Sequence, residues 1–221
     1  MNVLPDDSTA LRRELVETAR AAVATGLSVN ASGNASARCH RGARHGFLVT
    51  PSGLACDQLD VDDIVFVDDA GAPVGSRKPS TEWHFHSVIY ANRPDVGAVV
   101  HTHSPHATAL ACHRLPIPAF HYMVAVAGGP DIRCAPYATF GTQELSDRAL
   151  EALDGRKACL LSHHGMIAFS ETLAGAFALA VEVETLSAMY WRTLQVGEPS
   201  LLPESEMRAV LAKFETYRAS R

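Results

Sequence analysis

Two histidines separated by one residue, His101 and His103, end an alternating apolar pattern in residues 97–103, GAVVHTH. The alternation predicts a β-strand, on which residues i and i+2 point to the same face about 6.6 Å apart. Both imidazoles can then bind one ion, while Thr102 faces away. Zinc binds neutral imidazole and carboxylate, and its catalytic sites commonly combine three protein ligands with one open position. The motif therefore predicts part of a metal site.

The remaining ligands must come from elsewhere in the chain. One candidate is Glu82, near the start of the helix predicted for STEWHFHSVIYANRPD, and the other is one histidine of SHHG at residues 162–165. If that second segment is extended, His163 and His164 point to opposite faces, so only one of them can bind the ion. Alternatively, Glu82 is simply a carboxylate at a helix N-terminus, where the macrodipole favours it.

Seven of the 11 histidines lie between residues 84 and 121. Apart from the strand pair, these are expected to be structural: His84, His86, His106, His113 and His121. Side chains two positions apart on a helix, such as His84 and His86, do not face each other. The concentration of histidines together with a His-x-His pair favours metal binding over isolated hydrogen-bonded imidazoles.

Three segments rich in small and polar residues predict an anion site. Residues 30–38, NASGNASAR, contain glycine, which lets backbone N–H groups approach a ligand closely and form an anion cradle. The loops TPSG at 50–53 and KPST at 78–81 can add hydroxyl and amide donors, the latter next to Glu82. Taken alone, the first segment could be an ordinary turn from helix to strand. Together the three suggest a phosphate pocket.

Composition limits the setting. The chain has 221 residues, 47% of them hydrophobic, and a net charge of −5, which gives no general attraction to nucleic acid or to an anionic membrane. Five widely spaced cysteines without a CxxC pair indicate reduced thiols and small core residues in a cytoplasmic protein. The N-terminus has no signal-peptide pattern, and Glu182 and Glu184 interrupt the most apolar stretch. We expect one domain over residues 1–221.

The pattern of elements predicts an α/β domain. A helix is expected over residues 11–23, after capping candidates Ser8 and Thr9. Further helices are expected in residues 80–95, 104–113, 141–153 and 172–195 and from Glu204 onward, and strands are expected in residues 47–51, 62–75, 97–103 and 158–170. This order predicts a central, mixed or antiparallel sheet flanked by helices.

These motifs together resemble the zinc-dependent class II aldolase and adducin-head family. The resemblance is carried by GLSVNASGN, TPSG, STEWHFH, RPDVGAVVHTHSPHATAL, IPAFHYMVAVAGG, CAPYATFGTQELS, LLSHHG and KFETY, which span nearly the whole chain. It implies a three-layer α/β fold with a mostly antiparallel central sheet, and a homotetramer of four-fold symmetry with active sites between neighbouring subunits. It also implies one Zn²⁺ per subunit and cleavage of a deoxyketose 1-phosphate, such as L-fuculose 1-phosphate, into dihydroxyacetone phosphate and an aldehyde such as L-lactaldehyde.

Carried over residue by residue, the resemblance assigns roles to individual positions. The zinc ligands would be Glu82, His101, His103 and His164, and Glu82 would also be the acid and base at the enediol carbon. The substrate phosphate would lie on Asn34, Ser52, Gly53, Ser80 and Thr81, with Gly33 shaping the loop. Tyr122 would handle the proton of the aldehyde oxygen, Phe140 would form an aromatic wall, and Tyr217 would reach a substrate from the C-terminus.

The chain departs from the family pattern at two places. Ala31 stands where the phosphate loop often carries Thr or Ser, and residues 39–46 form a longer hairpin than usual, with His40 and His45 expected to be solvent-exposed. Other activities remain open on the same scaffold: a pentulose-phosphate epimerase, a dehydratase, a decarboxylase or an aldolase for another sugar phosphate. An adducin-like binding module is disfavoured because all four ligand types are present, and a three-histidine zinc hydrolase leaves the phosphate loops unexplained.

Overall fold

An eight-stranded sheet forms the centre of the computed structural model, which describes residues 4–219. The strands are β1 (Asn34–Arg41), β2 (Arg44–Val49), β3 (Val65–Asp68), β4 (Pro73–Val74), β5 (Ala98–Thr102), β6 (Arg133–Ala135), β7 (Ala158–Leu161) and β8 (Gly165–Ser170). Their order is β4-β3-β2-β1-β5-β8-β7-β6. Only the β6–β7 pair is parallel among these strands. The predicted mostly antiparallel sheet is confirmed.

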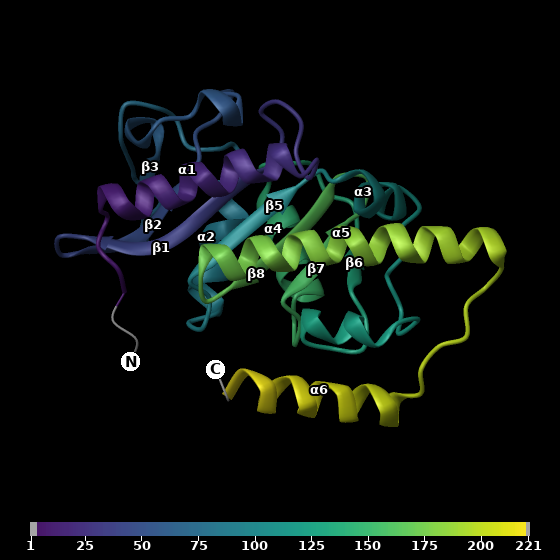
Figure 1. The fold of residues 1–221 in the computed structure, drawn as a ribbon. Helices are drawn as coiled ribbons and strands as arrows, with labels where there is room; N and C mark the ends of the chain where they lie inside the picture. The colour runs from purple at the N-terminus through teal and green to yellow at the C-terminus, as the bar shows by residue number, and fades with distance from the viewer. Residues whose placement is uncertain (1–3, 220–221) are drawn as a thin grey trace.

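Helices cover both faces of the sheet. The helices are α1 (Thr9–Ala24), α2 (Trp83–Asn92), α3 (Pro105–Cys112), α4 (Gln143–Ala152), α5 (Leu173–Val196) and α6 (Glu204–Ala219), with 3-10 helices η1 (Cys56–Gln58), η2 (Val61–Asp63) and η3 (Tyr122–Ala127). One core cluster joins the sheet to α1, α3 and α5, and the other joins its opposite face to α2 and α4. Figure 1 shows α1 and α5 side by side across the sheet. The predicted three layers are therefore present.

Local signals in the sequence explain most helix starts. The side chains of Ser8, Thr142 and Thr172 each accept a hydrogen bond from a backbone N–H in the first turn of α1, α4 and α5. Pro105 occupies the first turn of α3, where its missing N–H group costs nothing. α2 begins at Trp83 instead of the expected residue 80, and Glu82 occupies its N-cap without making a capping hydrogen bond.

The first strand of the sheet was not expected from the sequence. β1 begins at Asn34, inside the segment interpreted as a loop, and its small side chains are buried. Residues 39–46 complete the β1–β2 hairpin, in which His40 pairs with His45. His45 is exposed as expected, whereas His40 is half-buried, and its Nδ1 lies 3.2 Å from Asp6 Oδ1.

The cysteines and the long apolar helix match their expected roles only in part. All five cysteines are free; Cys39, Cys56 and Cys159 are buried, but Cys112 is exposed. α5 is long and apolar enough to cross a membrane by length and composition. Its buried side chains nevertheless pack against β5, β8 and α3, as in a core helix. The single domain over residues 1–221 stays a prediction.

Candidate metal centre and active site

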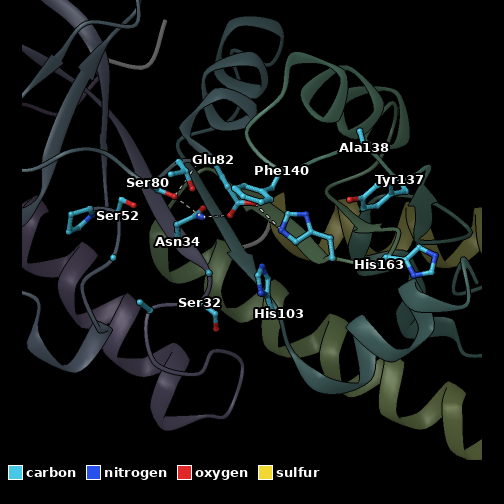
Figure 2. Close-up of a pocket in the computed structure, with 16 residues that line it drawn as sticks. Ser32, Asn34, Ser52, Ser80, Glu82, His103, Tyr137, Ala138, Phe140 and His163 are labelled. Carbon is cyan, nitrogen blue, oxygen red and sulfur yellow. Dashed lines mark hydrogen bonds and ion pairs between the residues drawn. The ribbon is translucent and has the colours of Figure 1, made fainter.

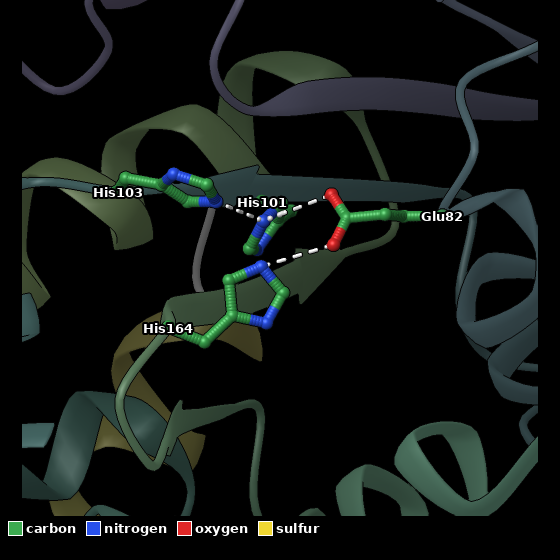
Figure 3. Close-up of side chains that lie close together, drawn as sticks. All are labelled: Glu82, His101, His103 and His164. Atoms are coloured by element: carbon green, nitrogen blue, oxygen red, sulfur yellow. Dashed lines mark hydrogen bonds and ion pairs between the residues drawn. The ribbon is translucent and has the colours of Figure 1, made fainter. Parts of the chain in front are cut away.

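Four side chains from three parts of the fold meet beside the sheet. His101 lies near the end of β5 and His103 just beyond it, Glu82 directly precedes α2, and His164 lies in the turn between β7 and β8. One potential ligand atom from each residue lies within 4.8 Å of the others. Figure 3 shows the three imidazoles and the carboxylate pointing toward one another. The structure thus brings together the four side chains expected to bind zinc.

Short distances connect the members of this cluster. Glu82 Oε2 lies 3.3 Å from His101 Nε2, and Glu82 Oε1 lies 2.9 Å from His164 Nε2. The Nε2 atoms of His101 and His103 are 3.0 Å apart. Glu82 Oε1 has no hydrogen bond of good geometry among residues 4–219. The carboxylate therefore faces the histidines with one oxygen unsatisfied.

The orientation of His101 fixes which of its nitrogens can bind a cation. Its Nδ1 lies 2.9 Å from the backbone oxygen of Met166, which can only accept, so Nδ1 donates. In the neutral ring Nε2 then carries a lone pair, and this lone pair points at His103 and Glu82. A hydrogen bond from a second group that fixes the ligand tautomer is typical of metal-binding histidines. Three nitrogens and one carboxylate oxygen suit a divalent cation that accepts nitrogen and oxygen ligands.

Burial and mutual contacts set the protonation of the cluster. Burial alone would raise the pKa of Glu82, but its close approach to His101 and His164 outweighs this and lowers that pKa well below its usual range. Burial, followed by the proximity of His101 and His164, lowers the pKa of His103 to about 4. Near neutral pH, Glu82 is therefore an anion and His103 a neutral imidazole. Both are in the form that binds a metal.

A pocket of about 310 Å³ opens beside the cluster (Figure 2). Its lining contains the side chains expected to bind phosphate and substrate: Gly33, Asn34, Ser52, Gly53, Ser80, Thr81 and Phe140. Glu82, His103 and His164 line it as well, whereas His101 is buried behind them. The pocket thus joins hydroxyl and amide donors to the four-residue cluster.

Gly33 makes the close approach of the loop to β5 possible. Its φ is +80°, in the left-handed region. A Cβ at this position would lie 2.7 Å from the backbone oxygen of His101 and 2.8 Å from Ser28 Oγ. A larger residue would force the loop away from the strand that carries the histidines. Gly33 therefore shapes the site without a side chain.

The pocket has an unusual charge balance for an anion site. No lysine or arginine is among the residues that line it, within the part of the chain that the structure describes. Donors near Asn34 are instead hydroxyls, an amide and backbone N–H groups, which match the predicted anion cradle. An anion in this pocket would therefore meet neutral donors and no lysine or arginine side chain of the described residues.

Two of the expected residues do not line the pocket. Tyr122 on η3 and Tyr217 on α6 have exposed fractions of 50% and 56% and lie outside the pocket lining. Phe140 lines the pocket yet is 63% exposed. One copy of the chain therefore supplies the metal cluster and the anion loops but not the two tyrosines.

Sequence reasoning also missed part of the pocket wall. Ala31, Ser32, Pro51, Tyr137, Ala138 and His163 line it as well. The SHHG segment is a turn rather than an extended strand, and His163 has a φ of +55°. The ring of His163 lies 6.1 Å from that of Tyr137 in an edge-to-face arrangement, far from Ser52 in Figure 2. The available signal was their place in the quoted motifs: Ala31 and Ser32 lie in NASGNASAR, Pro51 in TPSG, Tyr137 and Ala138 in CAPYATFG, and His163 in SHHG.

Comparison with known proteins gives a consistent result. The family model described as Class II Aldolase and Adducin N-terminal domain matches residues 13–191. The chain is 58% identical over 214 residues to a 5-methylthioribulose-1-phosphate/5-deoxyribulose-1-phosphate aldolase of Rhodospirillum rubrum, covering 97% of this chain and 95% of that protein. It is 45% identical over 208 residues to an L-fuculose phosphate aldolase of Escherichia coli K12, covering 94% and 95%.

A solved structure supports the same relationship. The fold is similar to that of an L-fuculose 1-phosphate aldolase, with a TM-score of 0.90 and 40% sequence identity, covering 94% of this chain and 97% of that chain. Class II aldolases depend on a metal, and the Glu82 cluster is able to bind one. The chain therefore belongs to the class II aldolase and adducin family, and it is an aldolase, a carbon–carbon lyase.

Proposed function

We propose that this protein is a zinc-dependent aldolase that cleaves a deoxyketose 1-phosphate into dihydroxyacetone phosphate and an aldehyde. The observation that carries the proposal is the direct contact between two features: the cluster of Glu82 and three histidines, and a pocket lined by the three predicted anion loops. The zinc hydrolase alternative would not require these loops. A sugar phosphate fills both parts of the site at once.

Different residues of the chain have different roles in the proposed reaction. Glu82, His101, His103 and His164 hold the ion, which would act as a Lewis acid for the negative charge that develops on the carbonyl oxygen. The loops around Asn34, Ser52 and Ser80 bind the phosphate through neutral donors. Glu82 is the anion beside the reacting carbon and moves its proton, so it is both ligand and general acid–base.

We propose that Tyr122 and Tyr217 act in the active site of a neighbouring subunit of a homotetramer. Both side chains are exposed and neither lines the pocket of its own chain, which supports this assignment. Tyr122 would exchange the proton of the aldehyde oxygen. Replacing Tyr122 with Phe should then reduce turnover by about 10²-fold or more while leaving zinc content unchanged. A normal rate would remove Tyr122 from the mechanism.

The substrate we favour is a 5-deoxypentulose 1-phosphate or its 5-methylthio counterpart. The relative named for these compounds is 58% identical to this chain, compared with 45% for the relative named for L-fuculose phosphate. At the end of the pocket away from Ser52, Tyr137 and His163 offer ring surfaces to an apolar 5-substituent. L-Fuculose 1-phosphate, which yields L-lactaldehyde, is the second candidate. We also propose that the enzyme is cytoplasmic, which agrees with its five free cysteines.

One experiment tests the proposal as a whole. Protein purified without chelators is analysed for metals, loaded with Zn²⁺ and incubated separately with 5-deoxyribulose 1-phosphate, 5-methylthioribulose 1-phosphate and L-fuculose 1-phosphate. We expect about one zinc per chain, release of dihydroxyacetone phosphate, and loss of activity on chelation. Cleavage that survives complete metal removal would refute the metal role. Epimerised, dehydrated or decarboxylated product without dihydroxyacetone phosphate would assign a different activity to the same site.

A further inference from the structure

A buried chain of hydrogen bonds leads from α2 and β1 to the metal cluster. It connects Tyr90, Ser36, His86, Asn34 and Glu82, whose exposed fractions are all 8% or less. The bonds run from Tyr90 Oη to Ser36 Oγ at 2.7 Å, from Ser36 Oγ to His86 Nδ1 at 2.7 Å and from His86 Nε2 to Asn34 Oδ1 at 2.5 Å. Asn34 Nδ2 then lies 3.0 Å from Glu82 Oε2.

The donor and acceptor of every hydrogen bond in this chain can be assigned by starting from Glu82, the acceptor at its end. Ionised Glu82 can only accept, so Asn34 must present its NH₂ group to it. The carbonyl oxygen of Asn34 then faces His86 and also can only accept, so His86 donates from Nε2. In the neutral imidazole Nδ1 is consequently the acceptor, and Ser36 donates to it. Ser36 has used its single proton, so Tyr90 donates to Ser36.

The reverse orientation of Asn34 is unfavourable at both ends. With the amide rotated by 180°, its carbonyl oxygen would face the Glu82 carboxylate, and its NH₂ group would face the N–H of His86. Two acceptors would meet at one end and two donors at the other, all of them buried, where unpaired polar groups are costly. Asn34 Nδ2 also lies 3.1 Å from Ser80 Oγ, so in the observed direction both N–H groups of the amide have an acceptor.

We propose that His86 is a positioning residue of the metal centre: its neutral Nε2–H form keeps the Asn34 amide turned so that it donates to Glu82. This inference rests on the proposed function in treating Glu82 as a metal ligand and acid–base. Groups that hydrogen-bond to a ligating carboxylate commonly change metal affinity or activity by about 10- to 100-fold. His86 contacts Asn34 and not Glu82 itself, so its loss is expected to weaken zinc affinity by about tenfold, at the lower end of this range.

The chemistry around His86 agrees with a fixed neutral ring. Burial, with a smaller contribution from nearby His101, lowers the pKa of His86 to about 3. Burial also raises the pKa of Tyr90, which keeps its hydroxyl protonated as the terminal donor. His86 and Glu82 lie four positions apart at the start of α2 and approach the two ends of one amide. One helix therefore sets the geometry of both groups.

A double-mutant cycle tests this proposal without substrate. Zinc affinity is measured by competition with a chromophoric chelator in wild type, H86F, N34A and the H86F/N34A double variant. H86F should weaken affinity about tenfold in the wild-type background and less than twofold in N34A, because the amide it orients is then missing. A Gln at this position can place an N–H group near the former Nε2, so H86Q should restore affinity to within about threefold of wild type.

A purely structural role gives different results. If H86F acted only through packing, it would weaken zinc binding equally in both backgrounds, and that outcome would overturn the proposal. The tautomer is read independently by ¹⁵N NMR of histidine-labelled protein: a His86 ring protonated on Nε2 is expected, and one protonated on Nδ1 alone or on both nitrogens overturns it. If the cycle and the tautomer hold but no ketose phosphate is cleaved, only the proposed function fails.

Discussion

Two regions of the molecule pair a glutamate with histidine, and only one of them is built as a metal centre. In the first, Glu82 faces His101, His103 and His164, and one of its oxygens lacks a hydrogen bond among the described residues. In the second, Glu184 on α5 lies 2.8 Å from His106 Nδ1. The two oxygens of Glu184 also accept the backbone N–H groups of His106 and Ala107, each at 2.9 Å.

The difference lies in what else the carboxylate binds. Glu184 satisfies free N–H groups in the first turn of α3, which is the task of a helix cap. Glu82 stands at the N-cap position of α2 but turns its carboxylate to the imidazoles instead. Proximity of glutamate to histidine is therefore not sufficient evidence for a metal site. The distinguishing feature of the first region is that three imidazoles converge on one carboxylate, of which Oε1 accepts no hydrogen bond among the described residues.

Removing one imidazole from the first region should have the largest effect. In His103→Ala, bound zinc should fall from about one per chain toward none, and cleavage should fall on the order of 10³-fold, because the ion contributes several kcal/mol to the transition state. Metal analysis and kcat/KM measure the two effects. His106→Ala is the matched control from the second region and should change both by less than about threefold. Equal losses in the two variants would contradict the distinction between the regions.

Lowering the pH should destabilise the metal-free protein, because His86, beside the first region, is buried as a neutral imidazole. His86 has a pKa of about 3 in the folded state compared with 6.5 for an ordinary histidine. The folded protein therefore binds fewer protons than the unfolded chain between these values, so stability is lost as the pH falls below about 6.5. One such group contributes at most about 1.4 kcal/mol per pH unit, and about 2 kcal/mol between pH 6.5 and 4.5, because the unfolded-state histidine is only half protonated at pH 6.5.

Urea unfolding at pH 6.5 and 4.5 measures this loss. In H86Q the free energy of unfolding should change less with pH, by up to about 1.4 kcal/mol per pH unit, because glutamine does not bind the proton that His86 binds on unfolding. His103, whose pKa is lowered to about 4, accounts for part of the slope that remains. Identical slopes in wild type and H86Q would show that His86 is protonated normally in the folded protein.

Removing the carboxylate of the second region should affect stability but not chemistry. Glu184→Ala deletes the cap of α3 and should reduce the free energy of unfolding by about 1–2 kcal/mol. Zinc content and kcat should stay within about twofold of wild type. Glu182→Ala, two residues earlier on α5, is the matched control and should change stability by less than about 0.5 kcal/mol. Loss of zinc from Glu184→Ala would make the second region part of the metal site.

The smallest effect is expected at the anion loops, which lie beside the first region. Ser52→Ala removes one neutral donor from the pocket and should raise KM about two- to tenfold, with little change in kcat or zinc content. Ser76→Ala, an exposed position outside the pocket lining, should change neither. A fall in kcat without a change in KM would place Ser52 with the reacting groups instead of the phosphate.

The sequence predicted those features that have local causes. The helix caps at Ser8, Thr142 and Thr172 and the strand that carries His101 follow from short-range patterns, so the elements and the α/β class could be predicted. β1 could not, because its residues are small and polar and are buried only through pairing with β2 and β5. Its apolar positions, Ala35, Ala37 and Cys39, alternate with polar residues, but their side chains are small and alanine is a poor strand former, so the sequence signal for a strand is weak.

The candidate site was predictable to the extent that its residues lie in compact motifs. Glu82 and the three histidines come from three such motifs, and the structure brings them together. The contact between Asn34 and His86 spans 52 positions and depends on how β1 lies against α2, so no sequence spacing indicates it. The role of His163 was obscured for a different reason, since a left-handed residue in a turn breaks the assumed alternation of faces.

Among residues 4–219, no lysine or arginine lines the pocket, and this has a consequence for assembly and turnover. A doubly charged phosphate ester would be bound here only by neutral hydroxyl, amide and backbone N–H donors. Its negative charge would then be balanced by the bound metal ion or by a neighbouring chain at the mouth of the pocket. On the proposed function, we therefore expect affinity for the ester to depend on metal loading and on contacts with a neighbouring chain, and we expect an isolated, metal-stripped chain to bind it weakly even with every loop donor in place.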